Sequence, residues 1–126
     1  MRPHRLIDLP LPPSVNAIYR KTRHGVHRSA AYRRWLINAD ADYLTSGRQP
    51  SWTAGPAKIV IEVLQGKGWR SRDLDNMLKP ILDWLVTRGM LVDDSAAHVR
   101  RVEIYLSQTV LSTPSRVLIR ITPATS

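Results

Sequence analysis

The chain has 126 residues, 43% of them hydrophobic, which argues against global disorder and predicts one domain with a single core. It contains no cysteine, which excludes disulfides and thiolate metal sites, and no apolar run approaches the ~20 residues that span a bilayer. Nineteen Lys and Arg against ten Asp and Glu leave a net charge of +9, which favours a polyanionic partner. Because the start of the chain lacks the apolar stretch of a signal peptide, we expect a cytoplasmic protein.

The first predicted strand covers 6–11, where apolar residues alternate on one face. Prolines at positions 10, 12 and 13 limit its ladder hydrogen bonds, so we expect an edge strand or one that ends early. Extended chain is expected to continue over 15–19. The segment 21–28 is expected to form a basic loop or the tip of a hairpin.

The first predicted helix covers about 30–45, with Ser29 as its N-cap. Its apolar face is formed by residues at spacings of four, three and four: Tyr32, Leu36, Ala39 and Tyr43. A loop rich in Gly, Pro and Ser follows over 47–56. The alternating β-branched residues of 57–65 predict the clearest strand of the chain.

A basic loop over 66–72 leads into a second predicted helix, which ends at Gly89. Its apolar face is expected to contain four leucines: Leu74, Leu78, Leu82 and Leu85. Pro80 removes a backbone donor one turn into a helix that starts at Asp75, so either the first turn is irregular or the regular helix begins near Lys79. Two more strands are predicted over 98–106 and 116–122. Strands interleaved with two helices predict an α/β fold, a single-domain mixed β-sheet packed with two main helices.

The acidic residues are gathered in the middle of a basic chain. Residues 9–39 contain six Lys and Arg and no acid. Five of the ten acids lie within a 22-residue stretch: Asp73, Asp75, Asp83, Asp93 and Asp94. Mg²⁺ and Mn²⁺ prefer oxygen ligands and share carboxylates with phosphate oxygens in phosphoryl-transfer sites. The pattern therefore favours a cation held against phosphate.

Asp73 and Asp75 are two residues apart and point to the same side if the chain there is extended, at the mouth of the second helix. Either Asp93 or Asp94 would supply a third carboxylate after the helix returns the chain. A structural interpretation is also open, in which the first two acids cap the helix and the later two form a turn. Lys79 would then belong to an ordinary surface ion pair.

Residues 72–95 resemble the signature of the RusA family of crossover junction endodeoxyribonucleases. That signature runs D-x-D-N, a Lys four residues after the second Asp, L-D-x-L, a Gly-containing turn and D-D. The opening segment, a strand that enters Pro12-Pro13-Ser14 and Asn16, also resembles the family. The resemblance implies a RusA-like fold over 1–126 and a homodimeric enzyme. Such an enzyme makes paired symmetric nicks in branched DNA, the four-way (Holliday) junction, in recombination and repair, with Mg²⁺ or Mn²⁺ as cofactor.

By this resemblance, Asp73, Asp75 and Asp94 are the catalytic acids that hold the metal, and Lys79 is the essential lysine. Asp94 is assigned as the second acid of the D-D pair. Asp93 is the fallback, because adjacent side chains generally cannot both face one site. Lys79 would stabilise developing charge or orient the nucleophile.

Other side chains around the acidic block carry secondary expectations. Asn76 is expected to orient a carboxylate or to cap the helix, and Asp83 to form a structural ion pair or hydrogen bond. Trp84 is expected in the core or a dimer interface, and Trp69 either packs or stacks on an unpaired base. DNA contacts are expected from two basic segments: Arg20, Lys21, Arg23, Lys67, Arg70 and Arg72.

Two other functions remain open from the residues alone. One is a non-catalytic basic protein that binds branched nucleic acid and uses its acids as helix caps. The other is a structural RNA-binding protein of ribosomal type, with no metal requirement and no preference for junctions.

Overall fold

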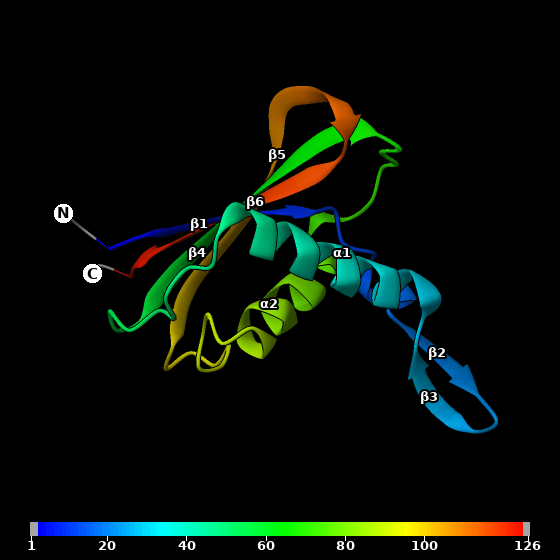
Figure 1. Cartoon of the computed structure of the whole chain (residues 1–126), viewed down its shortest axis with the longest axis horizontal. Helices are drawn as coiled ribbons and strands as arrows, with labels where there is room; N and C mark the ends of the chain where they lie inside the picture. The colour runs from blue at the N-terminus through cyan, green and yellow to red at the C-terminus, as the bar shows by residue number, and fades with distance from the viewer. Residues whose placement is uncertain (1–2, 125–126) are drawn as a thin grey trace.

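A computed structural model describes residues 3–124, which form six strands in two sheets, two α-helices and two short 3-10 helices (Figure 1). The main sheet has the order β1-β6-β4-β5. Its strands are β1 (Arg5–Pro10), β4 (Ala57–Lys67), β5 (Val99–Pro114) and β6 (Arg116–Pro123). Strand β6 runs antiparallel to β1 and β4, whereas β5 runs parallel to β4. The predicted mixed α/β fold is confirmed.

The two central strands, β4 and β6, supply most of the sheet's contribution to the core. Alternate residues of β4 lie beside alternate residues of β6, and all six side chains are fully buried: Ile59 with Ile121, Ile61 with Ile119, and Val63 with Val117. Strand β1 adds Ile7 and Leu9 to the same layer. This period of two buries one face of the sheet against the helices. The prediction of an edge position for β1 is also confirmed.

Helix α1 (Ala30–Ser46) begins where the sequence predicts. The Ser29 hydroxyl accepts a hydrogen bond from the backbone N–H of Tyr32 at 3.1 Å and donates to the carbonyl of Ala17 at 2.6 Å. Three residues of the predicted apolar face are buried and Leu36 is half-buried. Trp35, which the prediction omitted, is also buried, and its indole N–H donates to the Pro10 carbonyl at 2.8 Å.

Helix α2 (Leu78–Thr87) follows a 3-10 helix, η2 (Leu74–Met77). Both expectations raised by Pro80 hold, because the first turn is irregular and the regular helix starts one residue before Lys79. Pro80 occupies the third helical position, where a backbone N–H has no partner within the helix. The predicted leucine face is offset, since only Leu85 is fully buried. The buried positions are instead Met77, Pro80, Ile81, Trp84 and Leu85. No helix in the described part of the chain is long and apolar enough to cross a membrane.

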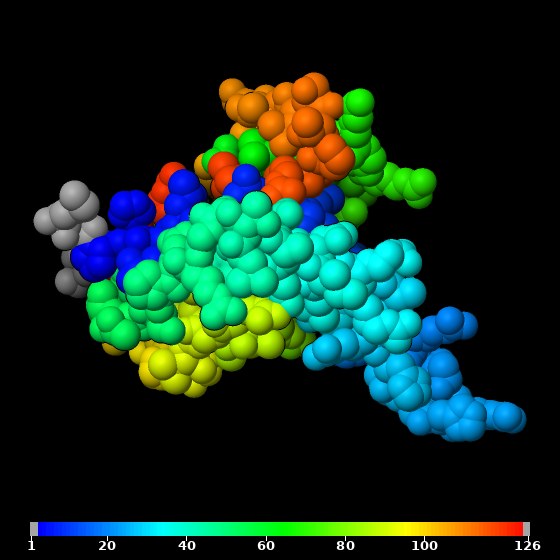
Figure 2. All heavy atoms as spheres, viewed as in Figure 1, coloured from blue at the N-terminus to red at the C-terminus, as the bar shows by residue number. Residues whose placement is uncertain are grey.

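A basic hairpin projects from the body of the molecule beside the start of α1 (Figures 1 and 2). The extended chain expected over 15–19 is wrong for its first part, because Val15–Ala17 form a 3-10 helix, η1, capped by the Ser14 side chain. Strands β2 (Tyr19–Thr22) and β3 (Gly25–Arg28) then pair antiparallel. Every residue of both strands is exposed.

Strand β5 bends around the end of β4 before it continues into β6 (Figure 1). The register between β4 and β5 shifts twice here, first between Val63 and Gln65 and then between Gln65 and Lys67. The backbone N–H of Gly66 donates to the Ser115 hydroxyl at 2.9 Å. A Cβ atom on Gly66 would lie 2.8 Å from the carbonyl carbon of Pro114, which is inside van der Waals contact. Glycine therefore permits this close approach of the two strands.

Candidate active site

The loop after β4 carries the first two predicted acids to the start of η2. Asp73 has an extended backbone (φ −71°, ψ 132°) and directly precedes η2, whereas Asp75 is the second residue of that 3-10 helix. The extended chain that would place both side chains on one side therefore ends at Asp73. Asp73 makes no side-chain hydrogen bond to the helix it precedes, so the capping interpretation fails for this residue. Both side chains are exposed.

Lys79 and Asp83 form an ion pair one turn apart on α2. The Nζ atom of Lys79 lies 3.2 Å from Oδ2 of Asp83. The structural ion pair expected for Asp83 is thus confirmed. The hydrogen bond and the charge of Asp83 raise the pKa of Lys79, and the charge of Asp94 also contributes to this rise. Lys79 therefore remains positively charged, and its charge interacts with the negative charge of Asp94.

The two adjacent acids after α2 have different surroundings. The Asp93 carboxylate accepts a hydrogen bond from the backbone N–H of Ser95 at 2.7 Å and lies 3.8 Å from Nε2 of His98. Its hydrogen bonds with Ser95, together with the charge of His98, lower the pKa of Asp93. Asp94 instead lines a cavity of about 200 Å³ with Asp83. Asp93 thus stabilises the turn, and Asp94 faces the side of α2 that carries Asp83.

The cavity beside Asp94 also receives aromatic and basic groups from the first third of the chain. Tyr19, Arg28 and Tyr32 line it at the base of the hairpin. The guanidinium carbon of Arg28 lies 5.9 Å from the centre of the Tyr32 ring. Burial raises the pKa of Tyr32, and the negative charge of Asp83 adds to the rise, so its phenol remains a hydrogen-bond donor. The fold therefore brings neutral donors and a guanidinium to the acid that follows α2.

Three acids differ from all the others in the described part of the chain. Six acids form an ion pair within residues 3–124, and a seventh, Glu62, interacts with Tyr105 and helps to raise the pKa of its hydroxyl; the six are Asp8, Asp40, Asp42, Asp83, Asp93 and Glu103. Asp73, Asp75 and Asp94 have neither an ion pair nor a side-chain hydrogen bond among the described residues, although the chain carries nineteen Lys and Arg. These three exposed carboxylates are free to bind a cation from solution.

The structure does not gather the three acids around one point. Within residues 3–124, no three His, Asp or Glu side chains are placed so that they could hold one metal ion together. The contribution of all three to a single site therefore stays a prediction. Their chemistry nevertheless fits Mg²⁺ or Mn²⁺, because Mg²⁺ is usually bound by one or two carboxylates together with waters and phosphate oxygens.

The residues predicted to contact DNA occupy two exposed regions. Arg20, Lys21 and Arg23 lie on the projecting hairpin, whereas Lys67 ends β4 and Arg70 lies on the loop that leads to Asp73. The sixth residue predicted to contact DNA is not exposed. Arg72 is half-buried and donates from Nη1 to the Pro12 carbonyl at 2.9 Å, so it ties the loop before Asp73 to the proline-rich turn.

Of the alternatives predicted for Trp84 and Trp69, the structure favours packing for both. Trp84 is only 1% exposed and belongs to the core, where its indole N–H donates to Asp40 at 2.9 Å. Trp69 is half-buried against the core. Sequence reasoning missed Tyr32 and Thr87 as cavity residues. No periodic signal in the chain relates either residue to Asp94, because the fold alone brings them together.

Comparisons with known proteins agree on one family. The family model described as "Endodeoxyribonuclease RusA" matches residues 10–122. A protein named crossover junction endodeoxyribonuclease RusA from Escherichia coli (strain K12) is 37% identical over 96 residues, covering 76% of this chain and 78% of the relative. Proteins with the same name are 37% identical in Enterobacteria phage 82 and 40% identical in Shigella sonnei (strain Ss046), with the same coverage of both chains.

Proposed function

The chain belongs to the RusA family of endodeoxyribonucleases, and from this premise we propose that it resolves four-way DNA junctions with the help of Mg²⁺ or Mn²⁺. Its relatives are named as crossover junction nucleases. The net charge of +9 supports DNA as the substrate, because every phosphate contact releases counterions. We assign the activity to recombination and repair of DNA in the cytoplasm.

One observation carries the catalytic part of the proposal. The three acids without an ion pair or a side-chain hydrogen bond in the described chain are the same three that match the family signature: Asp73, Asp75 and Asp94. If acids in so basic a chain served only structure, we would expect them to be paired or to cap a helix. Because these carboxylates have no such partners, their oxygens remain available as metal ligands.

The roles of the residues follow from their chemistry. Asp73, Asp75 and Asp94 would hold the cation. When bound, such an ion polarises the scissile phosphate and lowers the pKa of the attacking water. Lys79, kept positive by Asp83, stabilises negative charge that develops on the phosphate oxygens. Asp83 is a positioning residue, since it acts through Lys79.

We also propose that the protein acts as a homodimer. A four-way junction has two-fold symmetry, and a C2 dimer presents two equivalent sites to opposing strands. Two such sites would produce paired nicks at symmetric positions. Mapping both cut positions on a junction labelled on each strand tests this arrangement, and cuts on a single strand would contradict it.

Cleavage of a labelled four-way junction tests the proposed activity directly. The purified chain is incubated with the junction in Mg²⁺, Mn²⁺ or EDTA, with linear duplex of the same sequence as control. We expect symmetric cuts in the junction only with metal, and we expect Asp73→Asn to bind the junction without cutting it. A wild-type chain that binds junctions but leaves them intact with either metal would instead be a binding protein. Cleavage that persists in EDTA would contradict the metal requirement.

A further inference from the structure

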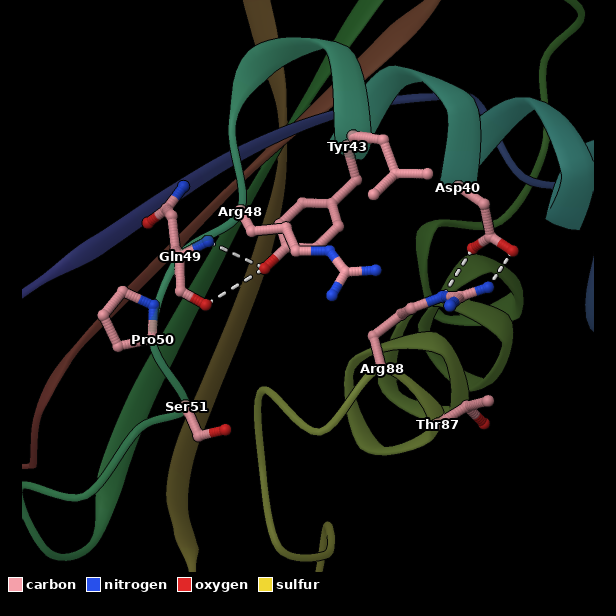
Figure 3. Close-up of a pocket in the computed structure, with 9 residues that line it drawn as sticks. Asp40, Tyr43, Arg48, Gln49, Pro50, Ser51, Thr87 and Arg88 are labelled. Atoms are coloured by element: carbon pink, nitrogen blue, oxygen red, sulfur yellow. Dashed lines mark hydrogen bonds and ion pairs between the residues drawn. The ribbon is translucent and has the colours of Figure 1, made fainter.

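Three cavities adjoin along the seam between α1 and α2. The cavity beside Asp94, about 200 Å³, shares Arg28 and Tyr32 with a second of about 150 Å³. The second shares Asp40 and Arg88 with a third of about 370 Å³, drawn in Figure 3. Thr87 lines all three. They follow one another along this seam, here called the α1–α2 groove, which runs from Asp94 past Tyr32 and Thr87, across the Asp40–Arg88 ion pair, to Arg48.

The groove has an excess of positive charge beyond Asp94. Asp40 is already neutralised, since it accepts from Nε of Arg88 at 2.7 Å and from the Trp84 indole. Asp83 is neutralised by Lys79. Within residues 3–124, neither Arg28 nor Arg48 has an acidic partner. Figure 3 shows Arg48 extending from the end of α1 toward Arg88 across the third cavity.

The length of the groove fits a chain of anions better than a single one. Tyr32 and Leu44 both line it, and they are twelve residues apart on α1, which corresponds to about 18 Å of helix. Successive phosphates of one strand are separated by about 3.4 Å along the duplex axis and by more along the winding backbone, so this length spans a few phosphates. Figure 2 shows α1 lying along the face of the molecule that carries this seam, with the hairpin at its start.

We infer that the α1–α2 groove binds the phosphate backbone of the DNA arm that flanks the cut, with Arg28 next to the scissile phosphate and Arg48 a few phosphates away. The inference rests on the proposed function, because a cut beside Asp94 sets the origin of this path. Arginine suits the role, since its planar fork binds phosphate oxygens in pairs. The hydroxyls of Thr87 and Ser51 add neutral donors along the way.

Site-specific cross-linking tests the path, because the chain contains no cysteine of its own. Leu44→Cys places a thiol in the third cavity, where Leu44 is 54% exposed. Leu6→Cys is the matched control, since Leu6 is 44% exposed and alternates with buried Ile7, so it lies on the sheet face away from the helices. Each variant is mixed in EDTA with junctions that carry a disulfide tethered to the backbone at successive phosphates from the branch, so that the cysteine thiolate forms a mixed disulfide and releases the outer thiol of the tether.

We expect the thiol at position 44 to cross-link to a short window of phosphates on one arm and the thiol at position 6 to give no such window. Equal labelling from both positions, or none from position 44, would overturn the groove assignment. Because EDTA suppresses metal-dependent cutting, this result is independent of whether the chain proves to be a nuclease. Junctions left intact in Mg²⁺ would refute the proposed function even where the cross-link is found.

A charge substitution provides a second readout. Arg48→Gln should weaken junction binding about fivefold at 0.15 M salt and reduce the salt slope of log K by about 0.9, the effect of one lost phosphate contact. Arg120→Gln removes the same charge from β6 on the opposite sheet face, between buried Ile119 and Ile121, and should change neither quantity. Equal effects of the two variants, or unchanged binding by Arg48→Gln, would show that DNA does not follow the groove. An acidic protein segment would then be the better candidate for its occupant.

Discussion

Asp93 and Asp94 are neighbours in the chain, but their carboxylates have no contact in common. Asp93 is occupied by the backbone N–H of Ser95, whereas Asp94 lines the cavity beside Asp83. We therefore expect Asp94→Asn to lose most cleavage. The loss of a metal ligand removes several kcal/mol of transition-state stabilisation, which is about a thousandfold in rate. Single-turnover cleavage of a four-way junction measures this loss.

Asp93→Asn is the control for that experiment. The Asn side-chain oxygen can still accept from Ser95, so the turn should persist and cleavage should stay within a few-fold of wild type. The opposite ranking of the two variants would make Asp93 the ligand. It would also mean that the turn rearranges when DNA binds.

Lys79 owes its raised pKa chiefly to the hydrogen bond and charge of Asp83. Asp83→Asn removes the negative charge, so the pKa of Lys79 should fall toward its ordinary value and the ammonium should lose its proton at lower pH. NMR titration of ¹³Cε-labelled lysine can follow this change, since the chain has only four lysines. The signal of Lys58, which pairs with Glu103 on the sheet, serves as the internal reference. An unchanged midpoint for Lys79 would show that the ion pair does not persist in solution.

Gly66 determines how two strands meet at the end of the sheet. A methyl group there would press on the backbone of Pro114 and Ser115, which cannot move as a flexible side chain can. We expect Gly66→Ala to lower the free energy of unfolding by about 1–3 kcal/mol, as overpacking generally does. Urea denaturation measures it. Lys67→Ala, an exposed position next to it, should change stability by less than about 0.5 kcal/mol. Equal stability of both variants would mean that β5 does not cross β4 this closely.

Elements that depend on local patterns were predictable. The Ser29 cap, helix α1 and strand β4 follow from a hydroxyl at a helix start and from spacings of four or two residues. The parallel pairing of β5 with β4 was not predictable, because backbone hydrogen bonds between distant segments leave no periodic trace. The buried face of α2 was also not predictable from the spacing of its leucines. Its leucines are as apolar as Met77, Ile81 and Trp84, and only the position of the sheet decides which set is buried.

The candidate site was likewise predictable only in part. The acids and Lys79 lie within one short motif, so their spacing is visible in the sequence. Tyr32 and Arg28 reach Asp94 only because the hairpin and α1 pack beside the end of α2. Tertiary contacts of this kind cannot be derived from composition or spacing.

At the scale of the whole molecule, the basic hairpin is an appendage whose side chains contribute little to stability. All residues of β2 and β3 are exposed (Figure 2). Replacing Arg20, Lys21 and Arg23 together with Gln should leave the thermal midpoint nearly unchanged. Junction affinity should fall, and the salt slope of log K should drop by up to about 2.7 if all three contact phosphates. Fluorescence anisotropy over a salt series measures both quantities.

The control removes equal charge from the sheet by replacing Arg100, Arg101 and Arg120, which are exposed on β5 and β6. If this variant loses as much affinity as the hairpin variant, the effect is one of net charge and the hairpin has no special role. A large fall in thermal midpoint for the hairpin variant would contradict its description as an appendage.

The strand order of the main sheet has a consequence for folding during synthesis on the ribosome. Within residues 3–124, β4 pairs with β5 and β6, and β1 pairs with β6. The two early strands of this sheet therefore pair with strands that are synthesised after them. Until Val99 and the residues after it have been synthesised, the β1 and β4 segments have no partner strand in this sheet. Contacts between such distant segments slow folding. The sheet can close only once Pro123 has emerged from the exit tunnel, so synthesis that stalls earlier leaves apolar strands open to chaperones and to aggregation.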